Sequence, residues 1–186
     1  NINKLIAEKN LETGKMDVID RLKELAMVNY GGILSPFNAW LVARGLVTAP
    51  LRMKQHSAVA LAVAQYLETC PGVRFVWYPG LESHPQHDRA ARLMNGQYSG
   101  MISFDIKGDA KTAQKFIDNL PIFSLLANVA DVKSLVIHPA TTTHSQCTEE
   151  ELLDQGIKPN TIRLSIGTEH IDDIIQDLDE AFKAVE

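Results

Sequence analysis

The stretch Thr-Ile-Arg-Leu-Ser-Ile at residues 161–166 alternates apolar and polar side chains, as a half-buried β-strand does. Its isoleucine and leucine residues face one side of a sheet, so Arg163 and Ser165 must face the other. A helical pattern follows over residues 169–185, with an apolar stripe at helical spacing and acidic residues in its first turn. A strand that leads into an amphipathic helix predicts a sheet covered by helices.

Working outward from this stretch, the same two periodicities recur along the chain. Strands are predicted at residues 73–78, 101–107 and 134–138. Helices are predicted over residues 19–27, from Ser35-Pro36 to Leu46, and over residues 51–69 and 110–120, with a short helix after the capping box of Thr148 and Glu151. Four strands interleaved with helices predict an α/β or α+β fold.

Composition narrows the classes of function. The 186 residues are 45% hydrophobic and 22% charged, with a formal net charge of -5, which suits one folded domain with an added arm. Net acidity argues against nucleic-acid binding, and no stretch approaches the roughly 20 apolar residues of a membrane helix. Cys70 and Cys147 match no zinc or redox spacing and are interpreted as free thiols of a cytoplasmic protein.

The first part of the chain is harder to interpret. Gly14 interrupts an otherwise helical, charged segment, so residues 1–16 are predicted to form a loosely packed N-terminal arm. The chain begins at Asn1 rather than Met, and we expect either a processed start or a piece of a longer protein.

Several common catalytic motifs are missing from the sequence. It contains neither a GxGxxG nor a GxxxxGK[ST] phosphate loop, and no GxSxG nucleophile elbow. The pair His84 and His87 lacks the further ligands that a metal site needs, so these residues, together with His138 and His144, are interpreted as loop histidines.

Arg163 is the side chain that most needs an explanation. A guanidinium in mid-strand between apolar neighbours is costly unless an anion pairs with it. Either an acidic residue of the chain forms a salt bridge with it, or it binds the carboxylate of a ligand bidentately. The segment from Leu126 to Ser145, rich in small and hydroxyl side chains, either lines a polar pocket or forms a solvated turn region.

Five separate motifs, in order, resemble one known family. They are Leu34-Ser35-Pro36-Phe37-Asn38-Ala39-Trp40, Arg44-Gly45-Leu46 to Leu51-Arg52-Met53, Tyr78-Pro79-Gly80-Leu81, Ser134-Leu135-Val136-Ile137-His138-Pro139-Ala140 running on to Thr143-His144-Ser145, and Ile162-Arg163-Leu164-Ser165-Ile166-Gly167. From about Asp17 onward, the chain is similar to the C-terminal part of the pyridoxal-phosphate (PLP) enzymes of Cys/Met metabolism. Within that family it looks most like the O-acetylhomoserine sulfhydrylases of methionine biosynthesis, which convert O-acetylhomoserine and sulfide to homocysteine and acetate.

The resemblance implies an architecture. It implies the small C-terminal domain of a fold-type I PLP transferase, a mostly antiparallel sheet with helices packed on it, preceded by a helical spine. Residues 17–70 would form that spine, leading to a large domain missing from this chain, and residues 71–186 would form the substrate domain. The family's cytoplasmic homotetramers imply a homo-oligomer here. The surface that faces the large domain is expected to be apolar and prone to self-association.

The resemblance also implies roles for four residues in binding a small amino-acid substrate. Arg163 matches the arginine that binds the substrate α-carboxylate. Asn128 matches a position whose backbone helps to hold that carboxylate, and Thr143 matches a threonine at the pocket edge. Ser134 lies near this group. Ala130 stands where relatives commonly have glycine.

One part of the family's machinery is absent. The lysine that forms a Schiff base with PLP lies in a Ser-x-Thr-Lys context in the large domain, and no lysine of this chain has that context. PLP chemistry needs that lysine, so we expect no catalytic residue in this chain and no activity from it alone. Two alternatives remain open: an orphan or split-gene domain that binds a carboxylate ligand or a partner chain, or a cystathionine γ-synthase, cystathionine γ-lyase or methionine γ-lyase within the family.

Overall fold

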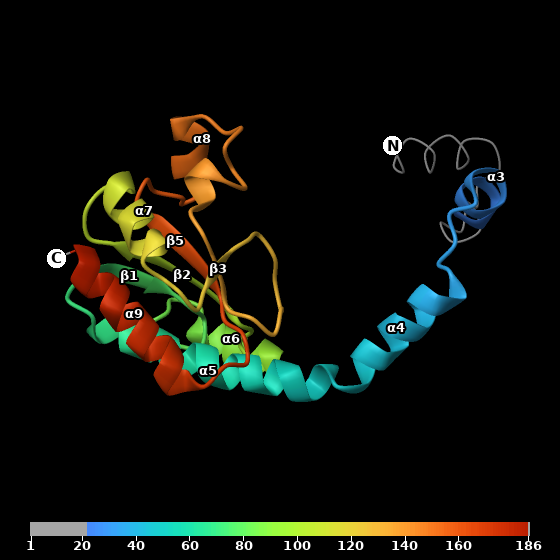
Figure 1. Cartoon of the computed structure of the whole chain (residues 1–186), viewed down its shortest axis with the longest axis horizontal. Coiled ribbons are helices and arrows are strands. Elements are labelled where there is room, and N and C mark those ends of the chain that lie inside the picture. Colours follow the sequence, from blue (N-terminus) through green and yellow to red (C-terminus); the bar gives the residue numbers. More distant parts are fainter. Residues whose placement is uncertain (1–21, 186) are drawn as a thin grey trace. The chain divides into compact units, whose positions relative to one another are not determined.

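The computed structural model describes residues 22–185 (Figure 1), so the predicted arm at residues 1–16 lies outside the described residues. The chain divides into two compact units, Asn1–Val47 and Thr48–Glu186. In the described part, no helix combines the length and the apolar character that crossing a bilayer requires.

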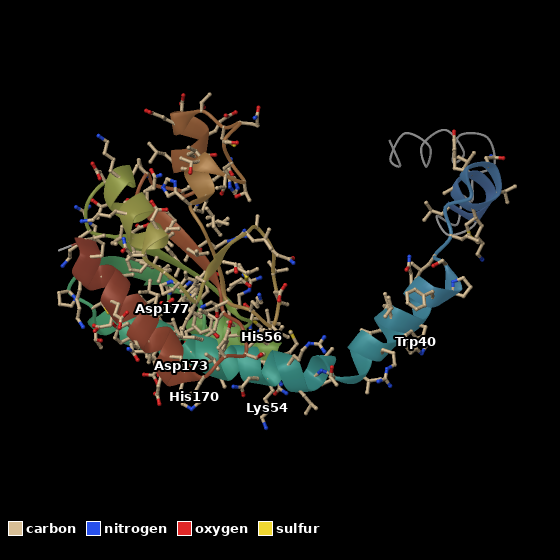
Figure 2. The ribbon with its side chains drawn as sticks, viewed as in Figure 1. Trp40, Lys54, His56, His170, Asp173 and Asp177 are labelled. Carbon is tan, nitrogen blue, oxygen red and sulfur yellow. The ribbon has the colours of Figure 1, made fainter. Side chains whose placement is uncertain are left out.

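The first unit is helical where it is described. A π-helical segment, Lys23–Met27, runs into α3 (Val28–Tyr30), and Gly31 then ends the helix with a left-handed φ of 65°. Next comes α4 (Pro36–Val47). The predicted N-cap is confirmed, because the Ser35 hydroxyl oxygen accepts a hydrogen bond from the Asn38 N–H (3.2 Å). All residues of α4 are exposed, among them the large side chain of Trp40 (Figure 2).

A five-stranded sheet forms the centre of the second unit. The strands are β1 (Val73–Trp77), β2 (Met101–Ile106), β3 (Ser124–Leu125), β4 (Leu135–Ile137) and β5 (Thr161–Ser165). Their order is β1-β2-β5-β4-β3, and every neighbouring pair is antiparallel except β3 and β4. The four predicted strands and the mostly antiparallel sheet are confirmed. The fifth, β3, was not predicted, because two residues are too few to show alternation.

Three helices cover one face of this sheet: α5 (Ala49–Thr69), α7 (Ala110–Asp118) and α9 (Ile171–Val185). The side chains that point into this face from β2 and β5 are fully buried: Ile102, Phe104, Ile106, Ile162 and Leu164. Phe104 of β2 lies at the centre, with its ring centroid 5.8 Å from that of Phe116 and 6.4 Å from that of Phe182. We call this the core face of the sheet.

Local capping explains where two of the helices begin. Asp109 and Thr112 form a capping box that starts α7, and the predicted box of Thr148 and Glu151 starts α8 (Glu149–Asp154). Gly156 follows α8 with a φ of 75°, a left-handed conformation that favours glycine. A further helix, α6 (His87–Met94), was not predicted. Both cysteines are free thiols, as expected.

Candidate functional site

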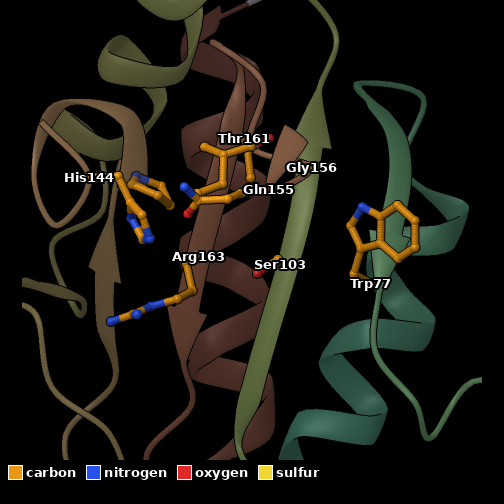
Figure 3. A pocket seen from close by; sticks show the side chains of 9 residues that line it. Trp77, Ser103, His144, Gln155, Gly156, Thr161 and Arg163 are labelled. Atoms are coloured by element: carbon orange, nitrogen blue, oxygen red, sulfur yellow. The ribbon is translucent and has the colours of Figure 1, made fainter. Parts of the chain in front are cut away.

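The second face of the sheet, opposite the core face, presents a row of side chains from four strands. Residues directly opposite one another in the register are Trp77 of β1, Ser103 of β2, Arg163 of β5 and Ile137 of β4. Figure 3 shows Arg163 and Ser103 between His144 on one side and Trp77 on the other. The alternation in residues 161–166 therefore places Arg163 where the sequence analysis expected it, on the face away from the core.

This row forms the floor of a cavity of about 370 Å³. The sheet contributes Trp77, Ser103, Thr161 and Arg163, and the wall comes from residues before and after α8, listed here: Pro139, His144, Gln155, Gly156 and Ile157. A cavity of this size lies in the lower part of the range that small-molecule sites occupy.

The guanidinium of Arg163 has no ion pair or hydrogen bond within the part of the chain that the structure describes, and the side chain is only partly exposed. Burial lowers the pKa of its guanidinium below the ordinary value, but an arginine in a protein stays charged. The sequence left two interpretations of Arg163 open, a salt bridge within the chain or the carboxylate of a ligand. The described residues do not form the salt bridge. A half-buried cation without an anion is suited to a carboxylate that arrives from outside.

The nearest strand carboxylate on this face is already engaged. Asp105 of β2 is buried, and its two oxygens accept hydrogen bonds from the Lys158 Nζ (2.6 Å) and the Thr161 hydroxyl (2.6 Å). Asp105 lies opposite Thr161, two residues along β5 from Arg163, so these contacts hold it in the next row of side chains on the same face. The negative charge on this face is thereby balanced without Arg163.

Thr143 does not line the cavity itself but is bonded to a residue that does. The Thr143 hydroxyl is hydrogen-bonded to the Nδ1 atom of His144 (2.9 Å), and His144 lines the cavity with Arg163. Earlier in the same segment, the His138 Nε2–H donates to the Pro159 carbonyl oxygen (2.7 Å), which ties the segment before α8 to the one after it. The structure thus places Thr143 next to a residue that shares the cavity with Arg163, and the role of Thr143 at the pocket edge stays a prediction.

Asn128 lies in the exposed loop of residues 126–133, which joins β3 to β4. Its side-chain oxygen accepts a hydrogen bond from the Val129 N–H (2.8 Å). In the same loop Ala130 has a φ of 59°, the left-handed region that favours glycine. This conformation gives a physical reason for the glycine that the resemblance implies at that position. The structure records no contact between Asn128 and the cavity lining.

Ser134 is fully buried at the start of β4, and its polar atoms are engaged within the chain. Its N–H and hydroxyl donate to the carboxylate of Glu169 (2.6 and 2.9 Å), and its hydroxyl oxygen accepts from the Gly167 N–H (2.9 Å). In this conformation the side chain has no free polar group for a substrate, so the geometry favours an indirect role.

Sequence reasoning missed Ser103 and Trp77 as lining residues. Strand alternation predicts which way they face, because Ser103 lies between the core residues Ile102 and Phe104 and must face the other way, but not that they lie beside Arg163. His84 and His87 form hydrogen bonds to nearby backbone groups. The Nδ1 of His84 accepts from the Gln86 N–H (3.2 Å), and the Nδ1–H of His87 donates to the Pro79 carbonyl oxygen (3.0 Å). Among residues 22–185, no cluster of three or more potential metal ligands occurs.

Fold and cavity together define an α/β domain whose sheet has one packed face and one face that borders a cavity lined by Arg163. Comparisons with known proteins identify its family. The sequence model of the Cys/Met metabolism PLP-dependent enzymes matches residues 10–183. The chain belongs to this family.

Individual relatives agree with this assignment. The chain is 47% identical over 156 residues to the O-acetyl-L-homoserine sulfhydrylase of Leptospira meyeri, covering 83% of this chain and 35% of that protein. It is 40% identical to the L-methionine gamma-lyase of Pseudomonas putida, covering 92% and 43% of the two chains. A solved structure from Campylobacter jejuni, proposed as an O-acetylhomoserine (thiol)-lyase and containing N'-pyridoxyl-lysine-5'-monophosphate, superposes with a TM-score of 0.84 at 42% identity, covering 89% of this chain and 39% of that one. The chain therefore spans well under half the length of these relatives.

Proposed function

We propose that this chain is the substrate domain of a cytoplasmic PLP-dependent enzyme that converts O-acetylhomoserine and sulfide to homocysteine and acetate. The observation that carries the proposal is Arg163, a partly buried cation in mid-strand with no anion of its own in the described chain, facing a cavity. Every amino-acid substrate of such a reaction brings an α-carboxylate that fits this guanidinium bidentately.

Within this function the chain's residues bind and orient the substrate. Arg163 holds the α-carboxylate, which restricts the rotation of the amino acid and fixes the direction of its side chain. Thr143 supplies a hydroxyl at the edge of the same pocket, and the backbone at Asn128 supports the carboxylate. Trp77 limits the cavity on the side of β1, where its ring stays partly exposed.

The cavity has only part of what a PLP enzyme needs. The residues lining the cavity include no lysine, and Lys158 is already paired with Asp105. The cavity thus offers a cation for a carboxylate but no amine that would hold the cofactor covalently. When bound, PLP would act as the electron sink for the reaction, and the residues that anchor it belong to the large domain in our proposal.

The partners of the chain follow from the same proposal. The exposed apolar residues of α4, among them Phe37 and Trp40, suit a surface covered by the large domain or by another subunit of a homotetramer. Free in solution, such a surface would favour self-association.

A competing activity within the family is elimination, which the likeness to an L-methionine gamma-lyase supports. The two are separated by assaying the complete protein that contains this chain with PLP. We expect homocysteine from O-acetylhomoserine plus sulfide, and little 2-oxo acid from methionine. The 186-residue chain alone, assayed in parallel, should produce neither. If the protein instead releases 2-oxo acid efficiently from methionine and forms no homocysteine from sulfide, the proposal is wrong and the protein is a lyase.

A further inference from the structure

A set of contacts outside the cavity joins the loop of residues 126–133 to the end of β5. We call these contacts the clasp, formed by residues 131–134 on one side and residues 166–169 on the other. The carboxylate of Glu169 accepts from the N–H and the hydroxyl of Ser134, and the Ser134 hydroxyl oxygen accepts from the Gly167 N–H. The Thr168 N–H adds a hydrogen bond to the Val132 carbonyl oxygen (2.9 Å).

The clasp is tightly packed at Gly167. A Cβ atom added there would collide with the Glu169 carboxylate and the Val132 carbonyl oxygen, and would lie 2.6 Å from the carbonyl carbon of Lys133. The residue before it, Ile166, is held from the helical side, because the His56 Nδ1–H donates to its carbonyl oxygen (2.6 Å). The end of β5 is thus held by α5 as well as by the clasp.

The two sides of the clasp lead to the two proposed carboxylate-binding elements. Arg163 lies on β5 a short distance before Ile166, and Asn128 lies in the loop that ends at Ser134. Residues 126–130 of that loop are all exposed, so packing does little to fix them. The loop's firm attachment is therefore the clasp, in which both Ser134 hydrogen bonds to Glu169 end on a carboxylate and gain strength from it.

We propose that Glu169 is a positioning residue for substrate binding, which acts through Ser134 to hold the Asn128 loop in register with Arg163. This inference rests on the proposed function, because it assigns Arg163 and Asn128 to one substrate carboxylate. Glu169 and Ser134 themselves need not touch the substrate. Loss of the clasp would separate the two halves of the carboxylate site and leave each half intact.

The kinetic test uses the complete protein with PLP. In Glu169→Ala we expect the KM for O-acetylhomoserine to rise roughly tenfold, with kcat changed less than about twofold and the KM for sulfide unchanged. Glu169→Gln, whose amide oxygen can still accept from the Ser134 N–H, should recover most of that loss. The matched control is Asp173→Ala, which removes an exposed carboxylate from the first turn of α9 (Figure 2) and should leave both KM values unchanged. An unchanged KM in Glu169→Ala, or a parallel rise for both substrates, would overturn the proposal.

A second measurement does not depend on activity. Amide hydrogen exchange of the 186-residue chain should quicken in Glu169→Ala within residues 126–134, while β2 keeps its protection. Unchanged exchange, or equal loss across the domain, would contradict a positioning role and indicate no role or a general structural one. If the complete protein fails to use any amino-acid substrate, the proposed function fails, whereas the exchange result still decides whether Glu169 holds the loop.

Discussion

The two faces of one sheet are built from the same strands but have opposite properties. On the core face, Ile102, Phe104 and Leu164 are fully buried against three helices. On the second face, Ser103 and Arg163 alternate with these residues and border a cavity. The core face satisfies its side chains by packing, whereas the second face leaves a charged group without a partner in the described chain.

This difference separates stability from function along a single strand. Truncating a close-packed apolar side chain lowers the free energy of unfolding, because a cavity remains. An unpaired, partly buried cation contributes nothing comparable to stability and costs desolvation. Neighbouring positions on β2 and β5 should therefore respond to substitution in opposite ways. Three experiments test that expectation, and a fourth tests a carboxylate on the helical side.

The largest effect on stability is expected from Phe104, at the centre of the aromatic cluster. Phe104→Ala should lower the free energy of unfolding by about 3–5 kcal/mol, because the cavity that it leaves is enclosed by Phe116 and Phe182. Denaturant unfolding of the 186-residue chain measures this change. The matched control is Ser103→Ala on the second face, expected to change the free energy by less than about 0.5 kcal/mol. Similar losses from both would remove the distinction between the faces.

Arg163 should show the reverse pattern. Arg163→Leu is expected to leave the free energy of unfolding unchanged or slightly raised, because it removes an unpaired, partly buried charge. In the complete protein it should weaken transition-state binding of the amino-acid substrate by about 2–5 kcal/mol, measured as a loss of kcat/KM. Arg163→Lys keeps the charge but not the bidentate fork and should fall between the two. A Leu variant that unfolds easily would indicate a structural arginine.

How far the sequence could predict these two faces depends on the range of the interactions. The core face was predictable, because alternation in residues 161–166 and 101–107 is a local pattern that burial enforces. Arg163 stood out by the same rule, as the exception in an apolar strand. Both capping boxes also connect residues three positions apart, although only that of Thr148 was predicted.

The rest of the site depends on contacts between distant segments. Ser134 meets Glu169, and Asp105 meets Lys158, through pairings that no local pattern encodes. Trp77 and Ser103 become neighbours of Arg163 only once the strand order is known. The roles of Asn128 and Thr143 are proposed from the family resemblance, because no local pattern marks either residue.

A paired charge on the second face should contribute to stability, and Asp105 is such a charge. Asp105→Ala removes the partner of Lys158 and leaves the Thr161 hydroxyl without its acceptor in a buried position. We expect a loss of about 1–3 kcal/mol in the free energy of unfolding. Asp105→Asn, which retains an acceptor for Thr161, should lose less. An Ala variant as stable as the parent chain would show that the row beside Arg163 is not held by these contacts.

The smallest effect concerns Asp177, a carboxylate buried on the helical side that accepts the Ile122 N–H (3.1 Å). Burial raises the pKa of Asp177 above its ordinary value, more than that hydrogen bond lowers it. The folded chain therefore binds this proton more tightly than the unfolded chain, and the contribution of Asp177 to stability is lost as pH rises from about 3.9 through the raised pKa. Asp177→Asn cannot ionise, so the free energy of unfolding of the variant relative to the parent should increase across that window, by at most about 1.4 kcal/mol per pH unit. Urea unfolding at a series of pH values measures the difference, in which the opposing contributions of the capping carboxylates Asp109 and Glu151, whose pKa values are lowered, cancel. A difference that does not vary with pH would show that the apolar side tolerates a charge as readily as the second face does.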